Sequence, residues 1–484
     1  MKGRTQAMHS LRNYYQKMSV QAKAAIWFAM CSILQKGISF ITVPIFTRCL
    51  TTEEYGTYSL YLSWLQILTI ITSLYLYQGV FNNGMTKYED DRDRYVSSMQ
   101  GLTLIITLGV YAIYAVTQDF WSKMLGLEPI FITLMFAEML VTPALSYWSG
   151  RQRFEYKYRR LVIITLLKSV ANPLLGMILV YHAKERAFAR VLSVVLVEVS
   201  FCCPIMVYQF VKGRCFIDKK YWKYALTLAI PLVPHYLAGM ILNQGDRVMI
   251  DKMVGKSEVA YYSLAYSIGM LVQIFISAVN SSITPWFYQK LKSRDVGNVK
   301  KTINSLLLMI AGLSLVIMMI SPELVLIFGS SKYAGAVYVI PPVASSVFFI
   351  FLYRLLAIPQ FYFEKTRFIA LSSIVAAALN IILNYVFIGL FGYIAAGYTT
   401  LACYVIYSMG HYIVSRRVLA DNLEGAELYD SSFIVLMSAL MILIGSIANG
   451  LFDYWYIRYA LLFGVAVFVV MKRQVLIETL RKDK

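Results

Sequence analysis

Long apolar stretches alternate with short polar connections along a chain of 484 residues. A bilayer core about 30 Å thick needs roughly 20 apolar residues per spanning helix, and about fourteen segments reach that length. Their expected positions are 24–47, 57–78, 97–117, 130–149, 161–181, 187–211, 224–251, 258–282, 303–321, 335–358, 368–388, 393–414, 432–450 and 455–471. The connections are too short for a soluble domain. We therefore predict an all-α integral membrane protein that acts within or at the membrane.

Basic residues alternate regularly with these segments. The formal net charge is +19, and Lys and Arg collect before the first segment and after every even-numbered one. One cluster, after the fourth segment, consists of Arg151, Arg153, Lys157, Arg159 and Arg160. Excess Lys and Arg mark cytoplasmic loops. The pattern predicts an even number of spans and two cytoplasmic termini, and it argues against nucleic acid as a partner.

A short internal repeat relates two parts of the chain. Residues 52–60 (TEEYGTYSL) resemble residues 256–264 (KSEVAYYSL) at an offset of 204 residues, and Asn172 matches Asn380 at a similar offset. Both matches relate segments six apart, so we expect two six-helix halves with the same membrane orientation. The predicted lobes are 1–213 and 214–421, and two extra helices with a cytoplasmic tail follow at 422–484.

Polar residues run through the first and the seventh predicted span at helical spacing. The stripe in the first span consists of Ser32, Gln35, Lys36, Ser39 and Thr42. The stripe in the seventh span consists of Tyr236, Gly239, Asn243, Asp246 and Arg247. A charge at the centre of a membrane helix costs about 2.5–3.5 kcal/mol, which is more than interhelical hydrogen bonding requires. We therefore favour two walls of a hydrated central cavity over simple helix packing.

Ionisable and amide side chains in the spans supply the candidates for function. The basic ones occur in both halves and suggest an electropositive cavity for an anion, since Arg offers a planar fork to phosphate and Lys a point charge. The substrate-binding candidates from this argument are Lys36, Lys168, Arg247, Arg354, Asn243 and Gln35. The candidates for carrying a coupling proton or sodium ion are Asp246, Glu138 and Glu198. Asp246 would equally neutralise Arg247, and Arg190 and Glu198 are spaced for a structural pair.

Two short motifs suggest nucleotide chemistry, but neither has the context it needs. A P-loop requires a Gly five residues before Gly255, where this chain has Ile250, and no strand precedes the motif. Asp91-Arg92-Asp93 resembles the DxD motif of glycosyltransferases, yet it lies in a short loop. The six cysteines show no metal-ligand spacing. We therefore expect no enzymatic activity, no cofactor and no metal site.

Three blocks taken together resemble one known family. They are ISFITVPIFTRCLTTEEYGTYSL at 38–60, DRVMIDKMVGKSEVAYYSLAYSIG at 246–269 and LNIILNYVFIGLFGYIAAGYTTLACYVIY at 379–407. They look like the Wzx-type polysaccharide flippases, which move O-antigen and capsule repeat units. These flippases form part of the multidrug/oligosaccharidyl-lipid/polysaccharide exporter superfamily.

The resemblance implies two six-helix lobes in a V that alternates between inward-open and outward-open. The implied substrate is an undecaprenyl-diphosphate-linked oligosaccharide, moved from the cytoplasmic to the outer leaflet of the bacterial plasma membrane for surface polysaccharide biosynthesis. Membrane lipid, a polysaccharide polymerase and the chain-length machinery are the implied partners.

Individual residues match the family's motifs. Arg48 belongs to the TR…EEYG block, which adds it to the substrate-binding candidates. Asp246 and Arg247 form the DR block, and Asn380 and Asn384 belong to the N…LN block, where we expect a structural role.

Two alternatives remain. A cation-coupled multidrug exporter of the same superfamily would show lone acids and aromatic residues in its cavity rather than basic ones. A membrane polysaccharide polymerase or ligase would need a substantial external loop with catalytic Arg or His residues.

Overall fold

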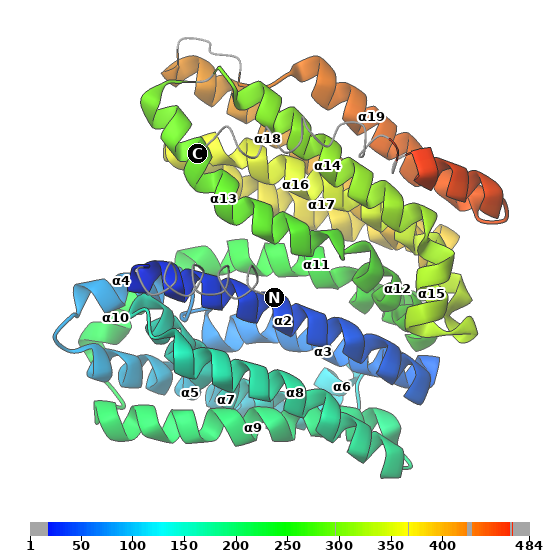
Figure 1. Cartoon of the computed structure of the whole chain (residues 1–484). Coiled ribbons are helices and arrows are strands. Elements are labelled where there is room, and N and C mark those ends of the chain that lie inside the picture. Colours follow the sequence, from blue (N-terminus) through cyan, green and yellow to red (C-terminus); the bar gives the residue numbers. More distant parts are fainter. Residues whose placement is uncertain (1–17, 296, 366, 424–427, 465–466, 468–484) are drawn as a thin grey trace, which may run out of the picture. The chain divides into compact units, whose positions relative to one another are not determined.

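The computed structural model describes residues 18–464 except 296, 366 and 424–427, together with residue 467. Every regular element in these residues is a helix (Figure 1), which confirms the all-α fold. The helices are α2 (Val20–Cys49), α3 (Thr52–Ser73), α4 (Gly79–Lys87), α5 (Arg92–Val116), α6 (Gln118–Leu125), α7 (Pro129–Phe154), α8 (Tyr158–His182), α9 (Arg186–Gly213), α10 (Lys219–Ala229), η1 (Ile230–Leu232), α11 (Val233–Met253), α12 (Lys256–Gly269), α13 (Val272–Ser293), α14 (Val299–Met319), α15 (Ser321–Gly329), η2 (Ser331–Val339), α16 (Ile340–Tyr362), α17 (Arg367–Phe391), α18 (Ile394–Asn422), α19 (Ser431–Ile447) and η3 (Ala448–Leu451).

Ten helical segments of the described chain are long and apolar enough to cross a membrane, or eleven if the bent pair α12 and α13 is one span. This makes the chain a multi-pass membrane protein, but the predicted number of fourteen spans is not confirmed. Helices α3 and α18, at the predicted spans 57–78 and 393–414, have 22 and 29 residues but are more polar. The predicted span 455–471 and the basic clusters at both termini extend outside the described residues.

The predicted continuous span 258–282 is wrong in one respect, because the structure breaks it. Helices α12 and α13 meet at a bend of 43°. Gly269 ends α12, and a Cβ at this position would lie only 2.7 Å from the Val343 side chain of α16. Glycine therefore permits a close helix contact at the point where the span changes direction.

The predicted span 224–251 is also not a single α-helix. A 3₁₀ turn, η1, separates α10 from α11, and Pro231 lies within it. Proline has no backbone N–H and cannot donate an α-helical hydrogen bond, so a 3₁₀ turn stands there, within a helical segment, Lys219–Met253, that is one candidate span.

The chain packs as two compact units. Unit 1 comprises residues 1–42 and 68–233, and unit 2 comprises residues 43–67 and 234–484. The short segment 43–67, which contains the end of α2 and most of α3, thus belongs to unit 2. The predicted lobes come from a sequence repeat, whereas these units are defined by packing. The units therefore do not test the lobe boundaries at 213/214 and 421/422, which stay predictions.

The core of unit 1 includes an aromatic cluster at one end of its helices. Tyr95 on α5 and Tyr147 on α7 are fully buried, and Phe81 on α4 packs against both rings. Tyr221 on α10 contacts Tyr95 edge-on. These packed rings fix the short helices α4 and α10 against the long ones.

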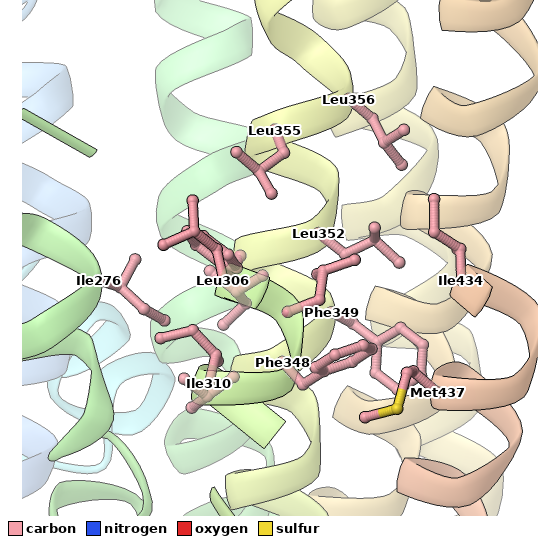
Figure 2. Close-up of a cluster of buried hydrophobic side chains, with 14 of the residues drawn as sticks. Ile276, Leu306, Ile310, Phe348, Phe349, Leu352, Leu355, Leu356, Ile434 and Met437 are labelled. Atoms are coloured by element: carbon pink, nitrogen blue, oxygen red, sulfur yellow. The ribbon is translucent and has the colours of Figure 1, made fainter. Parts of the chain in front are cut away.

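The core of unit 2 is organised around α16, which is buried along most of its length. Figure 2 shows Phe348, Phe349 and Leu352 of α16 between side chains of α13, α14 and α19. Ile310 of α14 and Met437 of α19 belong to this cluster. A helix that is apolar on all sides is buried by its neighbours, which is the position α16 occupies.

Each unit contains a turn of the same kind, and these two turns extend the internal repeat. Gln152, Lys157 and Arg159 correspond to Gln360, Lys365 and Arg367 at an offset of 208 residues. In both turns the lysine N–H donates to the glutamine carbonyl oxygen at 2.8 Å. The residue before each lysine has a positive φ, 55° at Tyr156 and 58° at Glu364. The starts of α3 at Thr52 and α12 at Lys256 also keep the offset of 204.

Candidate functional site

Asp246 lies at the centre of a polar network inside unit 2. Its side chain is fully buried on α11. Its carboxylate accepts hydrogen bonds from the Tyr262 hydroxyl of α12, the Asn384 amide of α17 at 2.6 Å and the Thr400 hydroxyl of α18 at 2.9 Å. Hydrogen bonds to a charged group contribute about 1.5–3 kcal/mol each. Three neutral donors therefore stabilise the buried carboxylate without a cation in direct contact.

The network continues along α17 and α18. The Asn384 amide also donates to the Asn380 side-chain oxygen at 3.2 Å, and the Thr399 hydroxyl donates to the Asn384 oxygen. Asn380 and Asn384 are fully buried. These contacts agree with the structural role expected for the asparagine block, and they connect it to Asp246.

Arg247 follows Asp246 in the chain but has different partners. Its Nε donates to the Ser263 hydroxyl at 3.1 Å and its Nη1 to the Asn243 carbonyl oxygen at 3.0 Å. Its guanidinium carbon lies 4.5 Å from the centre of the Tyr266 ring. No ion pair joins Asp246 and Arg247 in the described part of the chain. The buried guanidinium is held by neutral oxygens and an aromatic ring.

Asn243 links α11 to α12 and α18 through its side chain. Its amide nitrogen donates to the Gly239 carbonyl oxygen at 2.6 Å. Its side-chain oxygen accepts from the hydroxyls of Tyr266 and Tyr404, both at 3.4 Å. This arrangement places Asn243 directly beside Arg247.

The other two basic candidates of unit 2 make hydrogen bonds outside this network, although the Arg354 charge lies near Tyr404, which binds Asn243. Arg354 on α16 is half-buried, and its Nη1 donates to the Gln273 side-chain oxygen at 3.3 Å. Arg48 donates to the backbone carbonyls of Leu326 and Ile327 near the end of α15, at 3.3 and 2.7 Å. Arg48 therefore binds carbonyl groups in the last turn of α15, as basic residues commonly do at helix C-termini.

In unit 1 the structure brings together two candidates with different predicted roles. Lys168 on α8 and Glu198 on α9 form an ion pair at 2.6 Å, and their side chains are 21% and 10% exposed. The Cys202 thiol also donates to Glu198. Arg190, which was spaced to pair with Glu198, instead donates to the Ser193 hydroxyl at 3.1 Å.

The remaining candidates of unit 1 are distributed over α2 and α7. Gln35 donates to the Ser169 hydroxyl of α8 at 3.3 Å, next to Lys168. Lys36 is exposed on α2, and Glu138 is buried on α7. Gln35 thus links the stripe on α2 to α8 through Ser169.

A comparison with family models shows where this fold belongs. The model described as "Polysaccharide biosynthesis protein" matches residues 22–291, which is more than half of the chain. The chain belongs to the polysaccharide biosynthesis protein family. The resemblance carried by the three sequence blocks is thereby confirmed. A second model, MatE, matches residues 231–386.

Relatives and solved structures agree with membership in the polysaccharide biosynthesis protein family. Protein 1 of the Lsg locus of Haemophilus influenzae is 24% identical over 74% of this chain and 89% of its own length. The inward-closed structure of the lipid II flippase MurJ superposes with a TM-score of 0.69 at 11% identity, over 93% of this chain and 99% of that one. An inward-facing multidrug transporter of the MATE family has a TM-score of 0.61 at 16% identity, over 82% and 96%. The fold is thus similar to the folds of these two transporters.

Sequence reasoning missed several members of the network in this family member. Tyr262, Ser263 and Thr400 bind the two charged side chains, but hydroxyl residues are common in membrane helices and gave no separate signal. Tyr262 and Ser263 lie in the repeat KSEVAYYSL, so the repeat marked the segment without indicating what those residues contact. Thr400 lies in the third block of the family resemblance.

Proposed function

We propose that this protein is a flippase for undecaprenyl-diphosphate-linked oligosaccharide repeat units. It would move them from the cytoplasmic to the outer leaflet by alternating access, for surface polysaccharide biosynthesis. The observation that carries the proposal is the match of the polysaccharide biosynthesis family to residues 22–291 on a fold similar to that of a lipid II flippase. A lipid-linked diphosphate is an anion with a long apolar tail. Its transport needs basic side chains inside a multi-pass bundle.

Arg247 is the best-prepared residue for binding the diphosphate. Two of its nitrogens are already engaged and its plane is fixed over Tyr266, while Nη2 has no hydrogen-bond partner among the described residues. A guanidinium held in one orientation loses little entropy when it binds a phosphate oxygen. Lys36, Arg354 and Gln35 are further proposed ligands. Lys168 would bind substrate only after separating from Glu198, and Arg48 would have to leave the α15 carbonyls.

Asp246 is the proposed carrier of a coupling proton or sodium ion. Its carboxylate is surrounded by side chains that offer oxygens as well as donors, since the amide of Asn384 and the hydroxyl of Thr400 can reorient. Glu198 is a weaker proposal because Lys168 already neutralises it. The transport cycle itself needs no chemical step, so we expect a non-enzyme with no cofactor.

Complementation of a flippase-null strain with defined lipid-linked repeat units tests the proposal. We expect the wild-type chain to restore surface glycan and Arg247→Ala to abolish it while the protein still inserts. The matched control is Lys292→Ala, since Lys292 is an exposed basic residue in a predicted cytoplasmic loop. Normal glycan export by Arg247→Ala would contradict the proposed anion-binding role of Arg247.

A multidrug exporter is the second candidate, and the MatE match and the MATE-type neighbour favour it. The same strains distinguish the two. A drug exporter would lower the accumulation of a cationic dye without restoring surface glycan. A flippase would restore surface glycan without lowering the accumulation of the dye. The plasma-membrane location, both cytoplasmic termini and the polymerase and chain-length partners belong to the proposal as well.

A further inference from the structure

A pocket lies at one end of unit 1, where α7 ends and α8 begins. Its volume is about 490 Å³, within the range of small-molecule sites. Five basic side chains line it against two carboxylates, Asp93 and Glu155. The basic residues are Arg151, Lys157, Arg159, Arg160 and Lys212. The pocket lies on the side that the distribution of Lys and Arg predicts to be cytoplasmic.

The two carboxylates engage only part of this positive charge. Arg151 pairs with Asp93 and with Glu155, Lys157 also pairs with Glu155, and Lys212 pairs with Asp93 at 3.3 Å. Burial raises the pKa of Glu155, but hydrogen bonds from Lys157 and Arg151 outweigh it and leave the pKa below its usual value. Arg159 and Arg160 have no hydrogen bond or ion pair to another described side chain. They are the cations available to an anionic ligand.

The backbone around the pocket adds to the attraction for an anion. Helix α8 begins at Tyr158 with Arg159 and Arg160 in its first turn, and the residue at its N-cap, Lys157, makes no capping hydrogen bond with its side chain. The free N–H groups and the dipole of a helix N-terminus favour phosphate. Tyr156, directly before it, has a φ of 55°, a strained conformation for a bulky residue.

Gln209 provides an independent sign of a ligand. It lines the pocket, is 6% exposed, and its Oε1 is buried without a hydrogen-bond partner. Its Nε2 donates to the Ala144 carbonyl oxygen at 3.2 Å, which fixes the amide with Oε1 as the unused acceptor. A buried unpaired acceptor is costly. A ligand that carries a hydroxyl next to its phosphate would satisfy it.

The surroundings of the pocket indicate a lipid rather than a free phosphate. Val207 and Val211 on α9 are 57% and 67% exposed, and Ile163 and Leu167 on α8 are similarly exposed. These apolar side chains lie on the two helices that line the pocket, where acyl or prenyl chains would pack. The pocket volume also exceeds the needs of a lone phosphate ion.

We infer that this pocket binds the hydroxyl-bearing phosphate headgroup of a membrane lipid. Arg159, Arg160 and the start of α8 would hold the phosphate, and Gln209 would accept a hydrogen bond from a headgroup hydroxyl. The inference does not depend on the proposed flippase activity. A glycerophospholipid and the lipid-linked oligosaccharide diphosphate share this chemistry.

Native mass spectrometry of the full-length protein tests the inference, with phosphatidylglycerol, phosphatidic acid and phosphatidylcholine of equal acyl chains as probes. We expect phosphatidylglycerol to bind about tenfold more tightly than phosphatidylcholine, as expected for a charge-assisted contact. The double variant Arg159→Gln/Arg160→Gln should remove this preference. The matched control, Lys365→Gln/Arg367→Gln, loses the same charge at the repeat-equivalent turn of unit 2 and should retain it.

Equal losses in the two double variants would mean diffuse attraction to basic surfaces and would overturn the inference. So would equal binding of all three lipids by the wild type. Gln209→Leu provides a second, independent measurement. We expect the wild type to prefer phosphatidylglycerol to phosphatidic acid, because the glycerol headgroup offers hydroxyls to Gln209. The variant should bind phosphatidic acid normally and lose this preference. An unchanged preference would contradict the role of Gln209.

Competition identifies the source of the phosphate. Displacement of phosphatidylglycerol by undecaprenyl diphosphate, but not by glycerol 3-phosphate, would support a lipid ligand that includes the proposed substrate. Displacement by neither would support a glycerophospholipid. Equal displacement by soluble glycerol 3-phosphate would overturn the lipid assignment. Failure of glycan complementation would leave all of these results unaffected.

Discussion

The charged residues inside the two units are stabilised in different ways. In unit 1, Lys168 and Glu198 neutralise each other in a partly exposed ion pair. In unit 2, Asp246 and Arg247 are more deeply buried, yet each is held by neutral hydroxyls, amides and aromatic rings. In an ion pair each charge neutralises the other. A charge that has only neutral partners is not neutralised, so Asp246 can still bind a cation and Arg247 an anion. We therefore expect the residues that respond to a ligand to lie in unit 2.

The largest effect on stability should come from removing the Asp246 carboxylate. Asp246→Ala leaves the donors of Tyr262, Asn384 and Thr400 without their common acceptor, and we expect a loss of about 3–5 kcal/mol of stability. Thermal unfolding of the purified protein in detergent measures it. Asp246→Asn keeps most of the shape and should lose far less stability.

Asp246→Asn also tests ion coupling, which is a separate property. If Asp246 carries the coupling ion, the Asn variant folds but loses the ion dependence of transport in proteoliposomes. Transport with unchanged ion dependence in this variant would exclude Asp246 as the carrier.

A smaller effect is expected at the ion pair of unit 1. Lys168→Gln and Glu198→Gln should each cost about 1–2 kcal/mol, because the pair is only partly desolvated. The exchange variant Lys168→Glu/Glu198→Lys should recover part of that loss in a double-mutant cycle. If the singles are neutral and the exchange variant gains nothing, the pair does not stabilise unit 1.

The smallest effect should occur at Glu155, one of whose partners, Lys157, has a side chain that is 65% exposed. Burial raises the pKa of Glu155, but Lys157 and Arg151 lower it by more than burial raises it. In the folded protein the pKa of this carboxyl group is therefore below its usual value of 4.5. Its contribution is therefore present above that value and is lost as the pH falls through the lowered pKa. The melting temperatures of wild type and Glu155→Gln should differ at neutral pH and converge in acid. A constant difference at all pH values would contradict this assignment.

The sequence predicted the helical class of the fold and its family, and particular segments carried each prediction. The alternation of apolar segments with basic clusters predicted a multi-pass helical protein, and the blocks at 38–60, 246–269 and 379–407 predicted its family. The break in span 258–282 was not predictable, because Gly269 is informative only when Val343 of α16 is known to lie against it. The number of fourteen spans remains a prediction.

The candidate site was predicted as a set of residues, and their roles as ligands remain untested. Asp246, Arg247 and Asn243 were recognised from their cost in a membrane helix. Arg247 and Asn243 share contacts with each other and with Tyr266, whereas Asp246 has partners of its own. Their partners come from α12, α17 and α18, which are distant in sequence, and ordinary Tyr, Thr and Asn residues carry no sign of such contacts. Glu198 was matched by spacing to Arg190 on its own helix, whereas Lys168 on the neighbouring helix is its partner.

Sequence alone determined which side chains are expensive to place in a membrane, because that cost depends on the residue type and on the length of the apolar segment around it. It also determined the helical class and the family. Only the tertiary structure decided which partners offset the free-energy cost of burying each charge. Lys168 and Glu198 pair directly, Asp246 has neutral donors, and Arg247 lies against an aromatic ring. Hydrogen bonds and ring contacts depend on which helix faces meet, and that is a property of packing across distant segments.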